Sequence, residues 1–340
     1  MMHISDLPPE LLHHIMSYLS NTALVQAMCA APRLFVVPQR VLARRKWIAQ
    51  SFVTLAERGD LEGLRYKYQF YKARKFFINP LSLQRAVEWA SAEGHLAVVR
   101  YAQEEIFRSL LAPAAIDWAC RSGHLPVVEY LHNIGYAATN MGIIYACDNG
   151  HLHIIEYLHH KAYFHIITAA HIDAMNLACE NGHLALVQYL HRTVGLHCTA
   201  YAMDRASRNG HLGVVQYLHG SMHAPHTLNT PLTWASENGH LAVVQYLHET
   251  VGCACTARAM DDACKNGHLA VVQYLCRIGG DLVQSNAMNN AIVENHVEIV
   301  QFLHSVARLT TCNYFYLNKA NADTKALVKQ LNLTVLYNFF

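Results

Sequence analysis

Histidine and cysteine are the residues of this chain best suited to metal chemistry, and the sequence holds 24 histidines and 10 cysteines. A zinc site needs about four such ligands that converge on one point. Here the histidines instead recur at regular intervals, in two sets of equivalent positions. The first histidine row consists of His95, His124, His151, His183, His211, His240, His268 and His296. The second histidine row consists of His132, His159, His191, His219, His248 and His304.

Equivalent positions of a repeat lie along a line with one member in each unit, so both rows are expected to be structural and not metal ligands. Several cysteines share one repeated position with serine, which indicates a slot for a small side chain. Its members are Cys120, Cys147, Cys179, Cys264, Ser91, Ser207 and Ser236. The pair Cys253 and Cys255 has the wrong spacing for a zinc knuckle. Because no nucleophile elbow, phosphate-binding loop or isolated carboxylate pair is found, we expect no metal, no cofactor and no enzyme activity.

The first histidine row marks a repeat. Its Gly-His pairs follow one another at steps of 29, 27, 32, 28, 29 and 28 residues, from Gly94 to Gly267. An alanine lies four residues before each glycine and an apolar residue lies seven before it, which predicts a short, tightly packed first helix. Apolar residues after the glycine are spaced as on a second amphipathic helix. Each unit is therefore expected to be a helix, a glycine turn and a helix.

The segment Thr230–His240, TPLTWASENGH, resembles the signature of ankyrin repeats, in which threonine caps the first helix and proline lies in its first turn. The resemblance implies an all-α solenoid of stacked helix–turn–helix units, and a structural role for the first histidine row. We assign residues 49–338 to about nine or ten units, with a degenerate first unit at Gly59 and a degenerate last one near Asp323. The steps are shorter than the usual ankyrin period of about 33 residues, so we expect short loops between units.

Tyrosine recurs in the second helix of the units. This tyrosine row consists of Tyr101, Tyr130, Tyr157, Tyr189, Tyr217, Tyr246 and Tyr274. A spread-out row favours packing between units, with each hydroxyl reaching water or a backbone group. The alternative is an aromatic cage for a ligand, which needs local convergence.

The first 48 residues do not repeat. The stretch LPPELLHHIMSYLS near the N-terminus resembles an F-box, a family that docks on a Skp-type adaptor of a cullin ubiquitin ligase. The resemblance assigns adaptor binding to Leu7, Pro8, Leu11, Leu12, Ile15 and Leu19. Residues 30–35, AAPRLF, depart from the F-box pattern. The alternative is that residues 5–30 form a helical cap on the first repeat. An F-box followed by short ankyrin units resembles proteins of large DNA viruses of amoebae.

Composition limits the partners. The chain has 340 residues, of which 53% are apolar, and a formal net charge of +2, so we expect neither a nucleic-acid nor a membrane partner. The N-terminus lacks the pattern of a signal peptide, and no apolar run is long enough to span a bilayer. We therefore expect a monomeric protein with reduced thiols in the cytoplasm, or the host cytoplasm if viral, with the nucleus as a further compartment.

One segment mixes cations with aromatic residues. Residues 65–77, RYKYQFYKARKFF, lie in the long step between Gly59 and Gly94. Such a mixture is typical of nucleic-acid surfaces. Since the whole chain is nearly neutral, we favour a linker or packing helix over a nucleic-acid site.

Target binding is assigned to positions of the first helix that vary in chemistry beside the constant alanine. They lie five and two residues before the glycine, and Trp and Arg are enriched among binding hot spots. The candidate residues are Trp118, Arg121, Tyr145, Arg205, Arg208 and Trp234. The alternative is that the five-before position packs between units.

These patterns predict a substrate receptor that brings a target protein, bound by the repeats, to a cullin ubiquitin ligase through the F-box. The alternative is an ankyrin scaffold that binds or sequesters a partner with no ligase attached. A metal enzyme is the third and weakest interpretation.

Overall fold

The computed structural model describes residues 46–106, 114–163, 168–225, 227, 229–279, 285–305 and 311–336. The chain divides into two compact units, residues 1–142 and 143–340. Both are built from pairs of short helices joined by a glycine turn, as the repeat predicts. The adaptor-binding residues Leu7, Pro8, Leu11, Leu12, Ile15 and Leu19 lie outside the described residues.

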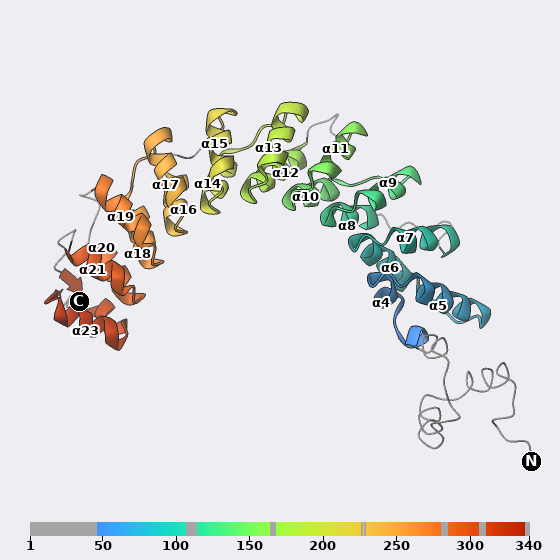
Figure 1. Cartoon of the computed structure of the whole chain (residues 1–340), viewed down its shortest axis with the longest axis horizontal. Coiled ribbons are helices and arrows are strands. Elements are labelled where there is room, and N and C mark those ends of the chain that lie inside the picture. Colours follow the sequence, from blue (N-terminus) through green and yellow to red (C-terminus); the bar gives the residue numbers. More distant parts are fainter. Residues whose placement is uncertain are drawn as a thin grey trace, which may run out of the picture. The chain divides into compact units, whose positions relative to one another are not determined.

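The N-terminal unit contains three described helix pairs (Figure 1). They are α4 (Phe52–Glu57) with α5 (Leu61–Ala73), α6 (Pro80–Ala92) with α7 (Leu96–Tyr101), and α8 (Ala114–Ser122) with α9 (Leu125–Asn133). First helices pack against first helices, α4 on α6 and α6 on α8. A π-helical turn, η2 (Ala102–Ile106), extends α7. Helix α10 (Asn140–Asp148) spans the division between the two units.

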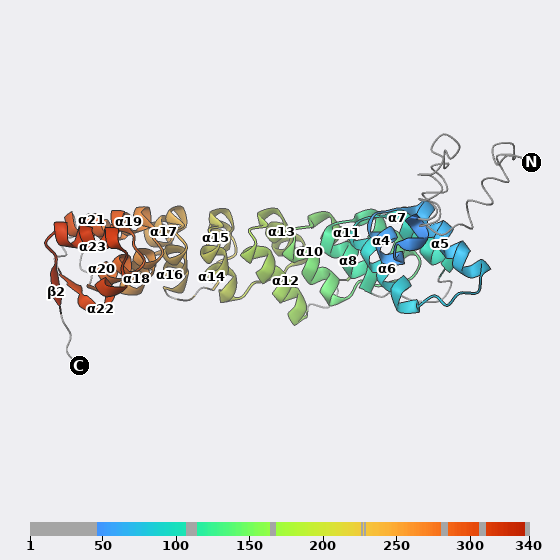
Figure 2. The same ribbon diagram turned by 90° about the horizontal axis from the view of Figure 1, so that it is seen from below.

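The C-terminal unit continues the same alternation. Its first helices are α12 (Ala169–Glu180), α14 (Ala200–Arg208), α16 (Thr230–Glu237), α18 (Ala257–Lys265) and α20 (Ser285–Val293). Its second helices are α11 (Leu152–His160), α13 (Leu184–Tyr189), α15 (Leu212–Gly220), α17 (Leu241–Tyr246), α19 (Leu269–Ile278) and α21 (Val297–Ser305), with π-helical turns η3 (Leu190–Val194) and η4 (Leu247–Val251) after α13 and α17. Seen from below, α14, α16, α18 and α20 form one layer and α15, α17, α19 and α21 the other (Figure 2).

The end of the chain departs from the helix pairs. It consists of β1 (Thr311–Asn313), α22 (Tyr314–Lys319), α23 (Ala322–Gln330) and β2 (Thr334–Leu336), and the two strands pair in parallel. Helices α22 and α23 form the degenerate last pair, and α22 packs on α20. The Asn321 backbone N–H, before α23, donates to Asn295 Oδ1 at 2.7 Å, which ties this pair to the preceding unit.

The alanine row lies at the contacts between first helices. Its members Ala90, Ala119, Ala146, Ala178, Ala206, Ala235, Ala263 and Ala291 are all 0% exposed. Only a methyl group fits where neighbouring backbones approach this closely, so the tight packing predicted from the sequence is confirmed.

The glycine turn between the helices is a Schellman motif, illustrated by Gly94. Its φ is +75°, in the left-handed region that glycine adopts without strain. The Gly94 N–H donates to the carbonyl of Ser91 at 3.3 Å, and the His95 N–H donates to the carbonyl of Ala90 at 2.8 Å. Thr230, expected to cap its helix, is the first helical residue of α16, and Asn229 holds the cap position.

A polar side chain six residues before the glycine forms hydrogen bonds to the next repeat, which was not predicted from the sequence. Asp117 accepts from the Thr139 N–H at 2.9 Å and from the Thr139 hydroxyl at 2.7 Å. Asn176 accepts from Thr199 in the same manner. In both cases a buried or half-buried side chain of one first helix accepts from the residue that precedes the next first helix. These contacts therefore set the distance between neighbouring repeats.

Candidate functional site

One face of the first helices carries exposed and half-buried side chains. The positions nine, five and two residues before the glycine are spaced i, i+4 and i+7, so they lie on one side of each helix; together they are called the first-helix face below. At the nine-before position the exposed side chains are Arg85, Met141, Asp173, Tyr201, Arg258 and Asn286. The sequence prediction contained only the five- and two-before positions. Extending the same spacing by one helical turn toward the N-terminus would have identified the nine-before position.

In the N-terminal unit, the first-helix face contains a groove of about 520 Å³ between α6 and α8. The predicted residues Trp118 and Arg121 line it, and the Arg121 guanidinium lies 5.2 Å from the centre of the Trp118 ring. Trp89 also lines the groove and is 47% exposed, although it was not among the six predicted target-binding residues. Arg85, Glu88 and Glu93 supply charges of both signs at its edge.

In the C-terminal unit, the predicted residues Arg205, Arg208 and Trp234 lie together. Nη1 of Arg205 donates to both carboxylate oxygens of Glu180, at 2.8 and 2.7 Å. The Arg208 guanidinium lies 5.7 Å from the centre of the half-buried Trp234 ring. These contacts join α14 to α12 and to α16, so the side chains both connect units and remain accessible; half of the Arg205 side chain, 49%, is exposed.

The remaining predicted residue, Tyr145, is half-buried on α10. The tryptophans and Tyr145 are thus neither core residues nor fully exposed ones. The two proposed roles of the five-before position, packing between units and binding, are compatible in this geometry. A half-buried aromatic ring with an arginine beside it resembles the composition of binding hot spots.

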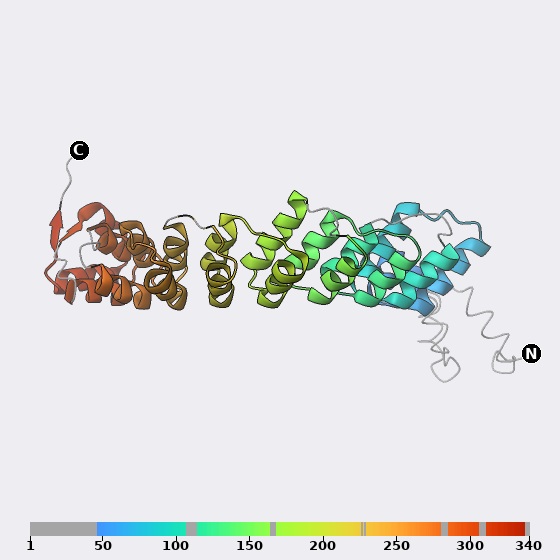
Figure 3. The ribbon, with the colours of Figure 1, turned by 90° about the horizontal axis from the view of Figure 1, so that it is seen from above.

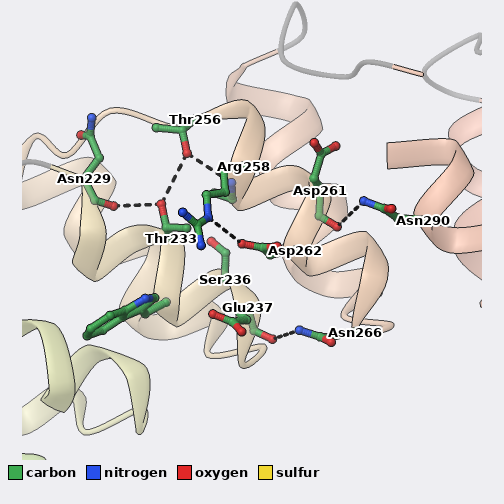
Figure 4. A network of polar contacts seen from close by, with 12 residues as sticks. Asn229, Thr233, Ser236, Glu237, Thr256, Arg258, Asp261, Asp262, Asn266 and Asn290 are labelled. Carbon is green, nitrogen blue, oxygen red and sulfur yellow. Dashed lines mark hydrogen bonds and ion pairs between the residues drawn. The ribbon is translucent and has the colours of Figure 1, made fainter. Parts of the chain in front are cut away.

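Polar contacts between units hold the first-helix face in register (Figure 4). The Asn266 side-chain amide donates to the carbonyl of Glu237 at 2.8 Å, and that of Asn290 donates to the carbonyl of Asp261 at 3.4 Å. Arg258 and Asp262 form an ion pair within α18 at 3.4 Å. The two amide hydrogen bonds join α16 to α18 and α18 to α20 below the variable side chains.

The first histidine row has the structural role that was predicted. Nε2 of His268 lies 3.0 Å from the carbonyl oxygen of Glu237 in the preceding unit, and Nε2 of His183 lies 2.9 Å from that of Asp148. Because a carbonyl only accepts, these rings carry a proton on Nε2. The other side of each ring lies against the glycine of the preceding unit.

The second histidine row corrects the prediction for the tyrosine hydroxyls. These were expected to reach water or a backbone group, but Tyr189 lies 2.9 Å from Nδ1 of His159, in the preceding unit. Tyr217 and Tyr246 pair in the same way with His191 and His219. In these three cases, a histidine of the second row and a tyrosine of the tyrosine row join neighbouring second helices, whereas the Tyr274 hydroxyl donates to Glu249 at 2.9 Å. The sequence prediction missed this pairing because it compared only equivalent positions of successive repeats, whereas the bond joins different positions.

The four cysteines that share the small-side-chain slot are buried. Burial raises the pKa of Cys120, Cys147, Cys179 and Cys264, so each thiol stays protonated at neutral pH. Cys255 lies 3.7 Å from Nδ1 of His248, and burial raises the pKa of that thiol as well. Within the described residues, no group of three or more His, Cys, Asp or Glu side chains is placed to hold a metal ion.

Of the two structural roles left open for the basic and aromatic segment, linker or packing helix, the structure shows mainly a helix. The segment forms most of α5, where the buried Lys67 ammonium donates to the carbonyl oxygens of Ile48, at 2.9 Å, and of Gln50. Burial lowers the pKa of Lys67. None of the described helices is long and apolar enough to cross a bilayer.

Comparison with known families supports the repeat assignment. The family model described as ankyrin repeats, in three copies, matches residues 116–201 and 203–286. Among curated proteins, none matches the chain.

Proposed function

The chain belongs to the ankyrin-repeat family, whose members are protein-interaction scaffolds. From this family, together with the F-box resemblance of the N-terminal sequence, we propose that the chain is a substrate receptor of a ubiquitin ligase. The repeats bind a target protein through the first-helix face. Residues 1–48 bind a Skp-type adaptor, and the ligase carries out the chemistry. The proposed division of the chain is thus an adaptor-binding segment followed by a repeat domain over residues 49–338.

The observation that supports target binding is the chemistry of the first-helix face. It combines half-buried aromatic rings with arginines whose guanidinium groups are held by neighbouring side chains, as at Trp118 with Arg121 and at Trp234 with Arg208. Truncating such residues costs about 2 kcal/mol or more in many interfaces. Because neighbouring first helices pack side by side, this face suits a partner that contacts several repeats at once.

The adaptor half of the proposal rests on the F-box resemblance of the N-terminal sequence. Leu11 and Ile15 are spaced i and i+4, so a helix places them on one face. The second candidate function, an ankyrin scaffold that sequesters its partner without a ligase, rests on the same first-helix face. It differs only in lacking the adaptor.

Affinity capture with the full chain distinguishes the two. The variant Arg121→Ala/Arg205→Ala/Arg208→Ala is expected to lose the target and keep the adaptor and cullin. The matched control is Arg100→Ala/Arg192→Ala/Arg277→Ala, because these exposed arginines also stack on tyrosine rings, at 5.2 to 5.4 Å, but belong to the second layer. Target capture that is unchanged in the first variant would place the site elsewhere. A target recovered without adaptor or cullin would favour the scaffold.

A further inference from the structure

The turn between α5 and α6 exposes large apolar side chains. Phe77 is 83% exposed, Leu81 66% and Phe76 51%. Phe77 is more exposed than any other large apolar side chain among the described residues. The turn lies at an outer edge of the N-terminal unit, beyond the ends of the neighbouring helices (Figures 2 and 3). Clustered apolar exposure of this kind marks interaction sites more often than single exposed residues do.

The same turn is strongly basic in a chain of nearly neutral charge. Residues 63–87 contain six lysines and arginines and no aspartate or glutamate. Lys67 is buried, but Lys72, Arg74 and Lys75 are exposed. None of these three forms an ion pair with a carboxylate of the described residues. Their charge therefore remains available to an anionic partner.

Local packing holds this arrangement in place. The Arg74 guanidinium lies 3.8 Å from the centre of the Phe70 ring, and Phe76 contacts the Phe70 and Tyr71 rings at 6.2 and 5.6 Å. The Phe76 N–H donates to the carbonyl of Tyr71 at 2.9 Å, which closes the turn. Phe77 follows outside this cluster. These contacts define the conformation of the turn, in which Phe77, Lys72 and Lys75 are exposed.

We propose that the turn formed by residues 72–81 docks on the surface of an anionic lipid bilayer. Phe77 and Leu81 would enter the interface, while Lys72, Arg74 and Lys75 meet the lipid phosphates and carboxylates. A net charge of +2 gives no general attraction, and for that reason no membrane partner was expected. The three clustered cations can still attract anionic lipids, because charges interact mainly within a Debye length of about 10 Å and not through the net charge of the whole chain.

Single-stranded nucleic acid fits this surface less well. Base stacking needs open aromatic faces, whereas Phe70, Tyr71 and Phe76 are engaged with one another and with Arg74. Of the four phenylalanines and tyrosines at residues 70–77, only Phe77 has no ring contact with another described residue, and the aliphatic side chain of Leu81 cannot stack. An aliphatic and an aromatic residue beside cations suit the lipid interface better.

Vesicle sedimentation with the full chain tests the proposal. Binding to phosphatidylcholine mixed with phosphatidylserine is expected, and binding to pure phosphatidylcholine is not. The variant Lys72→Gln/Arg74→Gln/Lys75→Gln should bind the mixed vesicles roughly a hundredfold more weakly, and Phe77→Ser/Leu81→Ser roughly tenfold or more. Far-UV circular dichroism checks that both variants keep their helices.

Two controls use the same substitutions elsewhere. Arg58→Gln/Lys161→Gln/Lys329→Gln removes three exposed cations, and Ile134→Ser removes an exposed large apolar side chain, all outside the first-helix face; both should bind as the wild type does. Equal binding by all variants, or no preference for phosphatidylserine, would overturn the proposal. So would tighter binding of a single-stranded oligonucleotide, measured by fluorescence anisotropy, that the same two turn variants abolish.

Discussion

The contact between each glycine turn and the histidine of the next unit can be tested at Gly239. Its φ is +78°, and a Cβ atom at this position would lie 2.5 Å from Nδ1 and 2.8 Å from Cε1 of His268. The variant Gly239→Ala therefore meets both backbone strain and a collision. The ring cannot move away freely, because its Nε2 is bonded to the carbonyl of Glu237 at 3.0 Å.

Gly252 separates these two effects. Its φ is +81°, but a Cβ atom there would have no atom within 4 Å. Gly252→Ala should thus cost only the strain of the left-handed conformation, about 1–2 kcal/mol. Gly239→Ala should cost the same plus about 1–3 kcal/mol for overpacking against His268.

Urea unfolding followed by far-UV circular dichroism measures both costs. Hydrogen exchange should show that Gly239→Ala loosens α16, α18 and the start of α19, since the damage spreads mainly to neighbouring units. Equal destabilisation by the two variants would show that the histidine contact contributes nothing to stability, and the structural account of the first histidine row would be wrong.

Other changes test the remaining contacts. Ala206→Leu, in a position that is 0% exposed, should cost about 1–3 kcal/mol; loss of hydrogen-exchange protection spread evenly along the chain would contradict a stack of neighbouring units. Tyr217→Phe removes the bond to His191 at a buried position and should lower the free energy of unfolding by about 1 kcal/mol; an unchanged urea midpoint would contradict this. Burial lowers the pKa of His171 below its ordinary 6.5, so the folded state favours the neutral ring. The protein should therefore keep its full stability above about pH 6.5 and lose stability as the pH falls below that value, because the unfolded chain then binds the proton more readily. Thermal unfolding between about pH 7 and pH 5.5 should show a smaller loss in His171→Asn than in the wild type, and equal losses would assign the pH dependence to other groups.

The repeat made much of the fold predictable. An alanine that recurs in every repeat indicates a position where only a methyl group fits, and a glycine four residues later indicates a left-handed turn. Few backbone geometries combine the two at this spacing, so the spacing alone places the alanine row in the core and the glycine at a turn. For residues 65–77 the sequence left a linker and a packing helix open, and the structure places residues 65–73 in α5. The terminal strand pair did not, since residues 311–313 and 334–336 pair across an intervening helix pair and neither segment shows a repeat.

The grouping of the candidate target-binding residues was predictable in part. Six residues were chosen for their chemistry, and the structure groups Trp118 with Arg121 and Arg208 with Trp234. It adds Trp89, because exposure depends on how neighbouring units overlap and not on residue type. The tyrosine–histidine and Asp117–Thr139 contacts were missed for a related reason: they join different positions in successive units, so no single aligned position reveals them.

The most direct test of the receptor assignment is titration calorimetry of the purified full chain with a purified Skp-type adaptor. The account expects one adaptor bound per chain, and no binding by Leu11→Asp/Ile15→Asp whose repeats keep their helical signal and their unfolding midpoint. Absence of binding by the wild-type chain, or undiminished binding by the folded double variant, would contradict it.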